Sequence, residues 1–599
     1  MVSKNFNAHT VHIPVMGIGF TIDTPVRVAH LGLSSVMSIG HDILIEKMRK
    51  HYCNLHNFPY EPITPDIEDY SAKRITAYLN LINIIVKDNF NKMIAEGYHT
   101  GSDVEKYIEM LPDYSVLKMN FIKFMETNPA EEDLKVWLKN NLIIGSIDVN
   151  IMTKVDKANY KNNELLPVEF NTAHIALRGY ANSTLESSLV LSAGINPRLY
   201  GYMENFKDFY PDESGKLKKK ITLKISDYRS ALIQGKFLAK KGIWISEYRV
   251  ESGLNCGGHA FATDGYLMGP ILEEIKTKKE SLIQTSYDLF SSALKDKNLF
   301  CPSVPPEVKI TAQGGVGTAE EHQFLLERFD LDSVGWATPF LLVPEVTNVE
   351  SHTRELLRIA EEKDIYLSNV SPLGVPFNSL RGNSKDVEKQ SFIDKGRPGS
   401  ACPDKYLSTN SEFTEKVICT ASREYQNLKI KELEANEPDS PGRDLLIDKI
   451  TEKSCLCIGL TTSVMHVNNM NMKVTGTGVA ICPGPNIAYF SEIVSLKKMI
   501  DHIYGKINIM MRKDRPNLFI KELGLYLDYF RSLTDSFAIN PTDVQQKQLT
   551  NFKNNLASGI AYYKEMFSNL KTSFADMKEN ILYELEMFEQ MTQELYANC

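Results

Sequence analysis

Two glycine-containing segments near the middle of the chain have the residue types that hold a phosphate group. The first is Thr311-Ala-Gln-Gly-Gly-Val-Gly-Thr-Ala-Glu-Glu-His322, and the second is Gly335-Trp-Ala-Thr-Pro-Phe340. Each pattern indicates a short strand and a turn, and glycines in such a turn let backbone N–H groups approach an anion. A helix start after the first turn adds partial positive charge. A (β/α)8 barrel binds phosphate with two such turns, after its seventh and eighth strands.

A third segment combines glycines with a histidine. It is Glu251-Ser-Gly-Leu-Asn-Cys-Gly-Gly-His259, and it follows a predicted strand. Its glycines permit close approach of the backbone to a ligand. The alternative interpretation of His259 is a solvated or hydrogen-bonded residue in a tight loop. The glycine pair and the preceding strand favour a functional imidazole at the mouth of a barrel, where it can exchange protons.

Strand patterns recur along the chain, with helical patterns such as Tyr228–Lys240 between them. Strands that alternate with helices indicate an α/β fold, and eight of them favour a closed (β/α)8 barrel over an open doubly wound sheet. The eight predicted strands are residues 12–17, 33–39, 146–152, 188–194, 221–226, 242–248, 308–312 and 333–335.

The regions outside the strands set the expected domain boundaries. Apolar residues recur at helical spacing in Ile75–Val86, which predicts a helical insertion in the barrel. Composition becomes polar beyond Gly382, and helical periodicity returns near the C-terminus. We predict a barrel from residues 1–50 and 143–383, a helical insertion at 51–142, an irregular cysteine-containing segment at 384–490, and a mainly helical region at 491–599.

The composition is that of a soluble globular protein, with 43% hydrophobic and 24% charged residues in 599. The net charge of -8 argues against a general nucleic-acid binder, because no basic surplus exists to neutralise phosphates. No apolar run approaches the roughly 18 residues of a membrane span. The N-terminus lacks the pattern of a secretory signal, and nine cysteines form no disulfide framework, so we expect a cytoplasmic location.

Five of the nine cysteines fall within a short part of the chain, between Cys402 and Cys482. Thiolates at short spacings can bind an iron–sulfur cluster or zinc. Against this, no Cys-x2-Cys pair occurs, and single buried cysteines are common packing residues. Both interpretations stay open. The candidate metal ligands are Cys402, Cys419, Cys455, Cys457 and Cys482.

In their order along the chain, these segments resemble the nitronate monooxygenase family, which includes flavin-dependent enoyl-ACP reductases. Ser252–His259 is similar to the family's sixth-strand motif. Ala312–Val316 and Trp336–Leu341 are similar to its two phosphate turns. The first strand, Pro14–Gly17, and a later element, Gly374–Asn383, also fit the family pattern.

The resemblance implies a (β/α)8 barrel that contains FMN. It places the backbone of Met16 and Gly17 against the isoalloxazine, and Asn150 in a hydrogen bond with flavin or phosphate. Lys224 would place a positive charge near the flavin N1–O2 edge, with an ion pair to a barrel carboxylate as the alternative interpretation. The FMN phosphate would be held by Gly314, Gly315, Ala337 and Thr338, and further backbone contacts would come from Gly257 and Gly258.

His259 corresponds to the histidine that the family uses beside its substrate, as a base or proton donor. Three positions depart from the family pattern. Asn255 replaces the usual Glu, Ala337 replaces a glycine of the second phosphate turn, and Pro339 replaces an Arg. The resemblance therefore covers the flavin side of the site and does not extend to the substrate.

The first hypothesis is an FMN-dependent oxidoreductase that acts on a small or acyl-type organic substrate. Flavin N5 would exchange hydride or electrons, and His259 would handle the proton. An oxygen-using version and a version linked to NAD(P)H both remain open, as does a homo-oligomer. The alternatives are an FMN-binding barrel that serves as a scaffold or interaction protein, and a flavin-dependent modifier of a macromolecule such as RNA.

Overall fold

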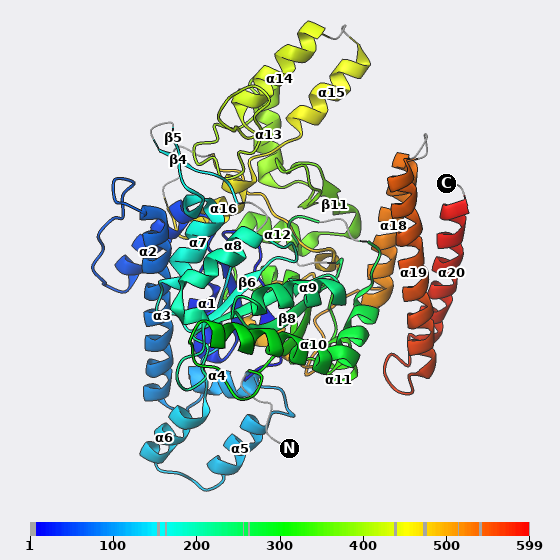
Figure 1. Cartoon of the computed structure of the whole chain (residues 1–599). Coiled ribbons are helices and arrows are strands. Elements are labelled where there is room, and N and C mark those ends of the chain that lie inside the picture. The colour runs from blue at the N-terminus through cyan, green and yellow to red at the C-terminus, as the bar shows by residue number, and fades with distance from the viewer. Residues whose placement is uncertain are drawn as a thin grey trace.

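The computed structural model describes residues 8–151, 156–161, 164–254, 257–260, 264–436, 440–470, 476–512, 514–537 and 542–597. Eight parallel strands close into a barrel at the centre of the molecule (Figure 1), in the order β1-β10-β9-β8-β7-β6-β3-β2. The strands are β1 (Val11–Ile13), β2 (Ser34–Ser38), β3 (Ile147–Asn150), β6 (Ser187–Leu191), β7 (Lys219–Ile225), β8 (Ile245–Glu251), β9 (Lys309–Gln313) and β10 (Ser333–Gly335).

The predicted (β/α)8 barrel is confirmed, and each predicted strand overlaps a barrel strand. The sixth strand, β8, begins at Ile245 rather than at residue 242. Gly242 has φ +74°, and its N–H donates to the Ala239 carbonyl at 2.9 Å, so it ends the preceding helix in the left-handed conformation. The strand continues to Glu251, at the carboxyl end of the barrel.

Helices alternate with the strands and pack on the outside of the barrel. Contacts of α9 with β7 and β8, of α10 with β8, and of α11 with β10 cover this surface. These helices and their neighbours are α1 (Thr24–Val28), η1 (Ala29–Leu31), η2 (Val168–Phe170), α7 (Thr172–Ala181), α8 (Pro197–Tyr202), η3 (Met203–Asn205), η4 (Lys207–Phe209), α9 (Tyr228–Ala239), α10 (Met268–Asp296), α11 (Ala319–Phe329), η5 (Thr338–Leu342) and α12 (Ser351–Ile359).

Several helices lie between β2 and β3. The longest, α3, forms the edge of the molecule in Figure 1 and packs on α2 and α7. Its buried face includes Ile75, Leu79, Ile82 and Val86, which share one side of a helix with 3.6 residues per turn. These helices are α2 (Asp42–Leu55), α3 (Tyr70–Glu96), α4 (Asp103–Met110), α5 (Val116–Met125) and α6 (Glu131–Asn141).

The chain after α12 adds three kinds of structure. The hairpin β11–β12 pairs in antiparallel fashion, α14 and α15 project away from the barrel, and α18, α19 and α20 form a bundle beside α10 (Figure 1). No described helix is long and apolar enough to cross a membrane. The remaining elements are β4 (Tyr160–Lys161), β5 (Glu164–Leu165), η6 (Glu362–Asp364), β11 (Ile365–Ser368), β12 (Phe377–Leu380), α13 (Ser384–Asp394), α14 (Arg423–Asn436), α15 (Pro441–Thr451), α16 (Leu456–Val467), η7 (Pro485–Tyr489), α17 (Leu496–Ile503), α18 (Leu518–Phe537), α19 (Asp543–Asn569) and α20 (Lys578–Ala597).

Polar side chains connect the middle strands of the barrel. The Arg249 guanidinium contacts the Glu247 carboxylate at 2.7 Å, and both residues are buried. Thr222 on β7 donates to Glu247 at 3.1 Å, and Thr311 on β9 donates to the same carboxylate at 2.5 Å. This network joins β7, β8 and β9, the strands whose ends carry three of the predicted site segments.

Candidate functional site

The residues predicted to bind a cofactor lie at the carboxyl end of a barrel strand or within a few residues after it. Asn150 is the last residue of β3, and Lys224 is the second-to-last residue of β7. Because all eight strands are parallel, these ends share one rim, where (β/α)8 enzymes place their active sites. Asn255 lies outside the described residues. The others follow their strands: Met16 and Gly17 after β1; Gly257, Gly258 and His259 after β8; Gly314 and Gly315 after β9; Ala337 and Thr338 after β10.

The Gly314–Gly315 turn has the backbone of an anion site. Both residues have positive φ, at +100° and +80°, which side chains other than glycine rarely tolerate. A Cβ on Gly315 would lie 2.5 Å from Leu254 Cδ1 and 2.6 Å from Leu518 Cδ1. Within the described part of the chain, the N–H groups of Gly314 and Gly315 donate to no protein acceptor. The turn therefore requires glycine and retains free donors for a bound anion.

The start of α11 differs from the expected phosphate cradle. Thr318 and Glu321 form a capping box at this helix end. Glu321 Oε2 also accepts from the Gly317 N–H at 2.9 Å. The first donors of the helix are thus used by its own carboxylate, whose charge offsets the positive end of the helix dipole. The donors left for an anion are those of the glycine turn.

The segment Cys482–Asn486, which the sequence analysis selected only for Cys482 as a candidate metal ligand, lies against both turns and the glycine pair. The Gly484 N–H donates to Thr338 Oγ1 at 3.1 Å, which leaves the Thr338 hydroxyl proton available to another acceptor. A Cβ on Gly257 would collide with the Cys482 carbonyl, so close backbone packing explains this glycine. The signal in the sequence was Cys-Pro-Gly-Pro-Asn, a turn sequence with no adjacent polar motif.

Lys224 forms the ion pair that was the alternative interpretation of its role. Its Nζ lies 3.0 Å from Glu251 Oε2, and Gln313 Nε2 donates to Glu251 Oε1 at 2.7 Å. Burial disfavours the charged carboxylate, but Lys224 and Gln313 outweigh it, so the pKa of Glu251 is lowered. The ammonium is therefore fixed at the rim beside a carboxylate of the next strand.

His259 is held by the segment that ends in β12. Its Nε2 lies 2.6 Å from Ser371 Oγ, and its ring meets Phe377 edge-on at 5.1 Å between centroids. The backbone also pairs, because Asn378 N–H donates to the Gly258 carbonyl at 2.9 Å. Burial lowers the pKa of His259 to about 4, so the imidazole is neutral at physiological pH. The sequence did not identify Ser371, which is distant in the chain.

Met16 and Gly17 lie in the loop after β1. The Met16 N–H donates to Thr21 Oγ1 at 3.2 Å, which bends this loop back on itself. Gly17 has φ +56°, and a Cβ there would lie 2.6 Å from the Phe20 ring. Phe20 therefore packs directly on the glycine, so this position requires glycine for both conformation and space.

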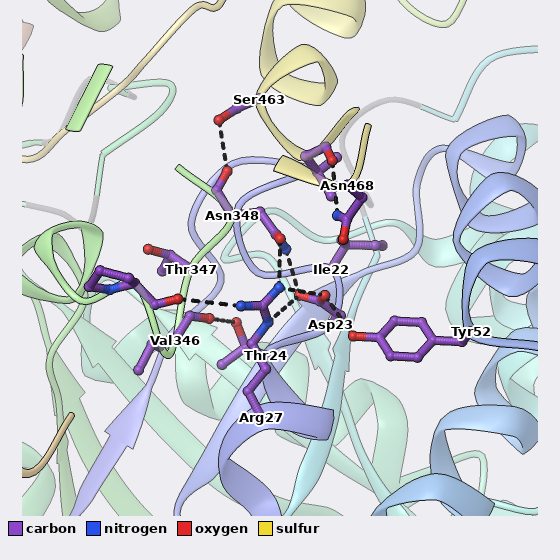
Figure 2. A network of polar contacts seen from close by, with 12 residues as sticks. Ile22, Asp23, Thr24, Arg27, Tyr52, Val346, Thr347, Asn348, Ser463 and Asn468 are labelled. Carbon is purple, nitrogen blue, oxygen red and sulfur yellow. Dashed lines mark hydrogen bonds and ion pairs between the residues drawn. The ribbon is translucent and has the colours of Figure 1, made fainter. Parts of the chain in front are cut away.

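A buried polar network braces the end of this loop (Figure 2). Asp23 accepts from Arg27 at 3.0 and 3.2 Å, from Tyr52 at 2.8 Å and from the Asn348 amide at 2.5 Å. Ser463 on α16 donates to the Asn348 carbonyl at 2.8 Å. The network thereby joins the loops that follow β1 and β10 to α16, and it fixes one wall of the rim.

The described residues give no support to a metal site at the five candidate cysteines. Among the described residues, no group of three or more His, Cys, Asp or Glu side chains could hold a metal ion. Cys402 pairs with Cys419, and Cys457 donates to Cys455, which lowers the pKa of Cys455 to about 7. Cys482 lies apart, in the segment beside Gly257. All five are buried free thiols.

Comparison with known proteins finds matching solved structures, and two of them are described here. No protein-family model matches the chain, and no curated protein does. FabK from Thermotoga maritima is 11% identical, with 88% of this chain and 96% of that chain covered and a TM-score of 0.36. The enoyl reductase domain of MlnA from Bacillus amyloliquefaciens is 12% identical, with coverage of 72% and 86% and a TM-score of 0.30. These values define no family, so the class of the protein follows from its topology: a (β/α)8 barrel with a candidate anion site on its rim.

Proposed function

We propose that this chain is an FMN-dependent oxidoreductase that acts on a small or acyl-type organic substrate. The observation that carries the proposal is the position of the two turns. Gly314–Gly315 and Ala337–Thr338 follow the seventh and eighth strands of a closed barrel, where (β/α)8 enzymes bind phosphate. The Gly-Gly-His segment follows the sixth strand at the same rim.

The residues at the rim fit FMN. Gly314 and Gly315 would donate backbone N–H groups to the phosphate, and Thr338 would donate its hydroxyl proton. Met16, Gly17, Asn150 and the Gly257–Gly258 pair would bound the rest of the cofactor. When bound, the flavin would supply hydride or electron transfer. NAD(P)H or oxygen would be the second reactant.

His259 would exchange a proton with the substrate. Burial keeps its imidazole neutral, so at physiological pH it acts as an acceptor more readily than as a donor. Ser371, whose hydroxyl contacts Nε2, orients the ring. Lys224, held by Glu251, would contribute a fixed positive charge on the neighbouring strand.

Binding of FMN tests the proposal directly. The purified protein is expected to be yellow, with an absorbance maximum at about 450 nm, and to release FMN on heating. Gly315→Ala should weaken FMN binding at least roughly tenfold, because a Cβ there meets Leu254 and Leu518 at positive φ. Gly396→Ala is the matched control, with φ +64° and open space around its Cβ. Colourless wild-type protein that cannot be reconstituted with FMN would contradict the proposal.

Replacement of His259 by alanine should leave FMN bound and reduce turnover by about 10²–10⁴-fold. Stopped-flow reduction by NADH or NADPH, and reoxidation by oxygen, an α,β-unsaturated thioester or an alkyl nitronate, would identify the productive direction. In that direction, wild-type kcat/KM should stay level from pH 8 to about pH 5 and fall below it as His259 is protonated. Unchanged turnover in the alanine variant would remove the assigned role of His259.

A further inference from the structure

Arg515, in the chain before α18, reaches the glycine turn from outside the barrel. It is only 7% exposed. Its guanidinium donates to the Gly315 carbonyl at 2.7 Å, to Asn486 Oδ1 at 3.0 Å and to Glu321 Oε1 at 2.7 Å. A Cβ on Gly317 would lie 2.6 Å from Arg515 Nε, so the guanidinium packs directly on the turn. Three separate parts of the chain thus meet at one buried cation.

Asn486 holds the same turn from the same side. Its Nδ2 donates to the carbonyls of Gly315 at 2.9 Å and Val316 at 2.7 Å. In a trans peptide, the N–H points opposite to the carbonyl of the preceding residue. By fixing the Gly315 carbonyl toward themselves, Arg515 and Asn486 therefore direct the Val316 N–H away, as a donor on the opposite face of the turn.

Arg515 forms an ion pair with the buried carboxylate of Glu321, beside the glycine turn. Glu321 is 2% exposed and accepts from the N–H groups of Gly317 and Leu518, at 2.9 and 2.7 Å. A carboxylate so close to the glycine turn would repel a phosphate dianion at the same turn. Arg515 pairs with this carboxylate inside the protein, where the two opposite charges cancel.

We infer that Arg515, Asn486 and Glu321 form a clamp through which the C-terminal region sets the affinity of the barrel for the phosphate of its cofactor. This inference rests on the proposed function. The clamp residues are positioning residues: Arg515 and Asn486 orient the turn, and Arg515 cancels the charge of Glu321. Without Arg515, the buried carboxylate would oppose any phosphoryl group that the turn binds.

Two single substitutions separate the charge effect from simple loss of structure. Arg515→Met and Glu321→Gln each break the same ion pair, but they leave opposite charges beside the turn. Arg515→Met should weaken FMN binding by roughly 10–100-fold, whereas Glu321→Gln should change it by less than about threefold. Asn486→Ala, which changes no charge, should weaken it by a few fold. Flavin fluorescence titration of the apoprotein measures each Kd, and thermal melting shows that each variant is folded.

Riboflavin lacks the phosphate and is therefore the control ligand. Arg515→Met and Glu321→Gln should bind it with nearly equal affinity. Arg512→Ala is the matched control, because Arg512 pairs with the exposed Asp514 on the same segment and lies 5.2 Å from the centroid of the Tyr489 ring. If Arg515→Met does not fold, Arg515→Lys keeps the charge and should bind FMN within about fivefold of wild type. Equal loss of FMN affinity in Arg515→Met and Glu321→Gln would overturn the clamp. Wild-type protein that binds no FMN would instead refute the proposed function.

Discussion

Replacement of Asp23 by alanine is expected to lower the free energy of unfolding by about 3–5 kcal/mol, the usual cost of removing one partner of a buried ion pair. Asp23 is fully buried and accepts hydrogen bonds from Arg27, Tyr52 and Asn348 (Figure 2). Burial disfavours the Arg27 cation, and Asp23 more than compensates, so the pKa of Arg27 is raised. Alanine would leave Tyr52 and the Asn348 amide without this acceptor, and it would leave the Arg27 cation without its carboxylate, with only the neutral acceptors Asn348 Oδ1 and Pro344 O among the described residues.

Urea unfolding at pH 7.5 measures this loss. Asp113→Ala is the control, because Asp113 pairs with Lys118 at the surface and its side chain is 73% exposed, so the change should cost less than about 1 kcal/mol. Asp23→Asn should fall between the two, since the amide keeps one acceptor and loses the charge. A loss for Asp23→Ala no larger than that of the control would show that the network does not brace the loops.

The barrel could be predicted because each strand is a local signal. Short apolar runs that end in glycine or a polar residue mark parallel strands wherever they occur, and their number and alternation with helices fix the closed topology. The same logic placed the glycine turns and the Gly-Gly-His segment at the carboxyl ends of their strands. The strand ends were less accurate: β1 ends at Ile13 rather than at residue 17, and β8 begins at Ile245 because Gly242 ends the preceding helix.

The contacts that surround the turns could not be predicted in this way. Asn486 and Arg515 are separated from Gly315 by 171 and 200 residues, and no periodicity links them. The pairing of Ser371 with His259 spans 112 residues. Cys482 is close to the other candidate cysteines in sequence, yet it lies beside Gly257, and the metal site stays a prediction. For Lys224, the sequence predicted the kind of partner, a carboxylate of the barrel. It did not identify that partner as Glu251.

Acidification is expected to destabilise the protein steeply below pH 6.5. Burial lowers the pKa of His322 to about 3 and of His9 to about 4, and holds that of His12 well below its usual range. The folded state thus binds protons more weakly than the unfolded chain. The stability that these neutral histidines contribute is fully present above about pH 6.5. It is lost as the pH falls toward their pKa values in the folded state, at about 1.4 kcal/mol per pH unit for each histidine. Buried Asp148 and Glu522, whose pKa values burial raises, oppose part of this loss.

His322 offers the sharpest test, because its hydrogen bonds fix the neutral form. Trp336 Nε1 donates to His322 Nδ1 at 3.1 Å, so a proton on Nδ1 would break that bond inside the core. Urea unfolding between pH 7.5 and pH 5 measures how the free energy of unfolding depends on pH. Below pH 6.5, His322→Gln should reduce this slope by roughly 1.4 kcal/mol per pH unit, the contribution of one histidine. His99→Gln should leave it unchanged, since the His99 side chain is 55% exposed. An identical pH dependence in wild type and His322→Gln would mean that His322 gains its proton without unfolding, and that the acid sensitivity arises elsewhere.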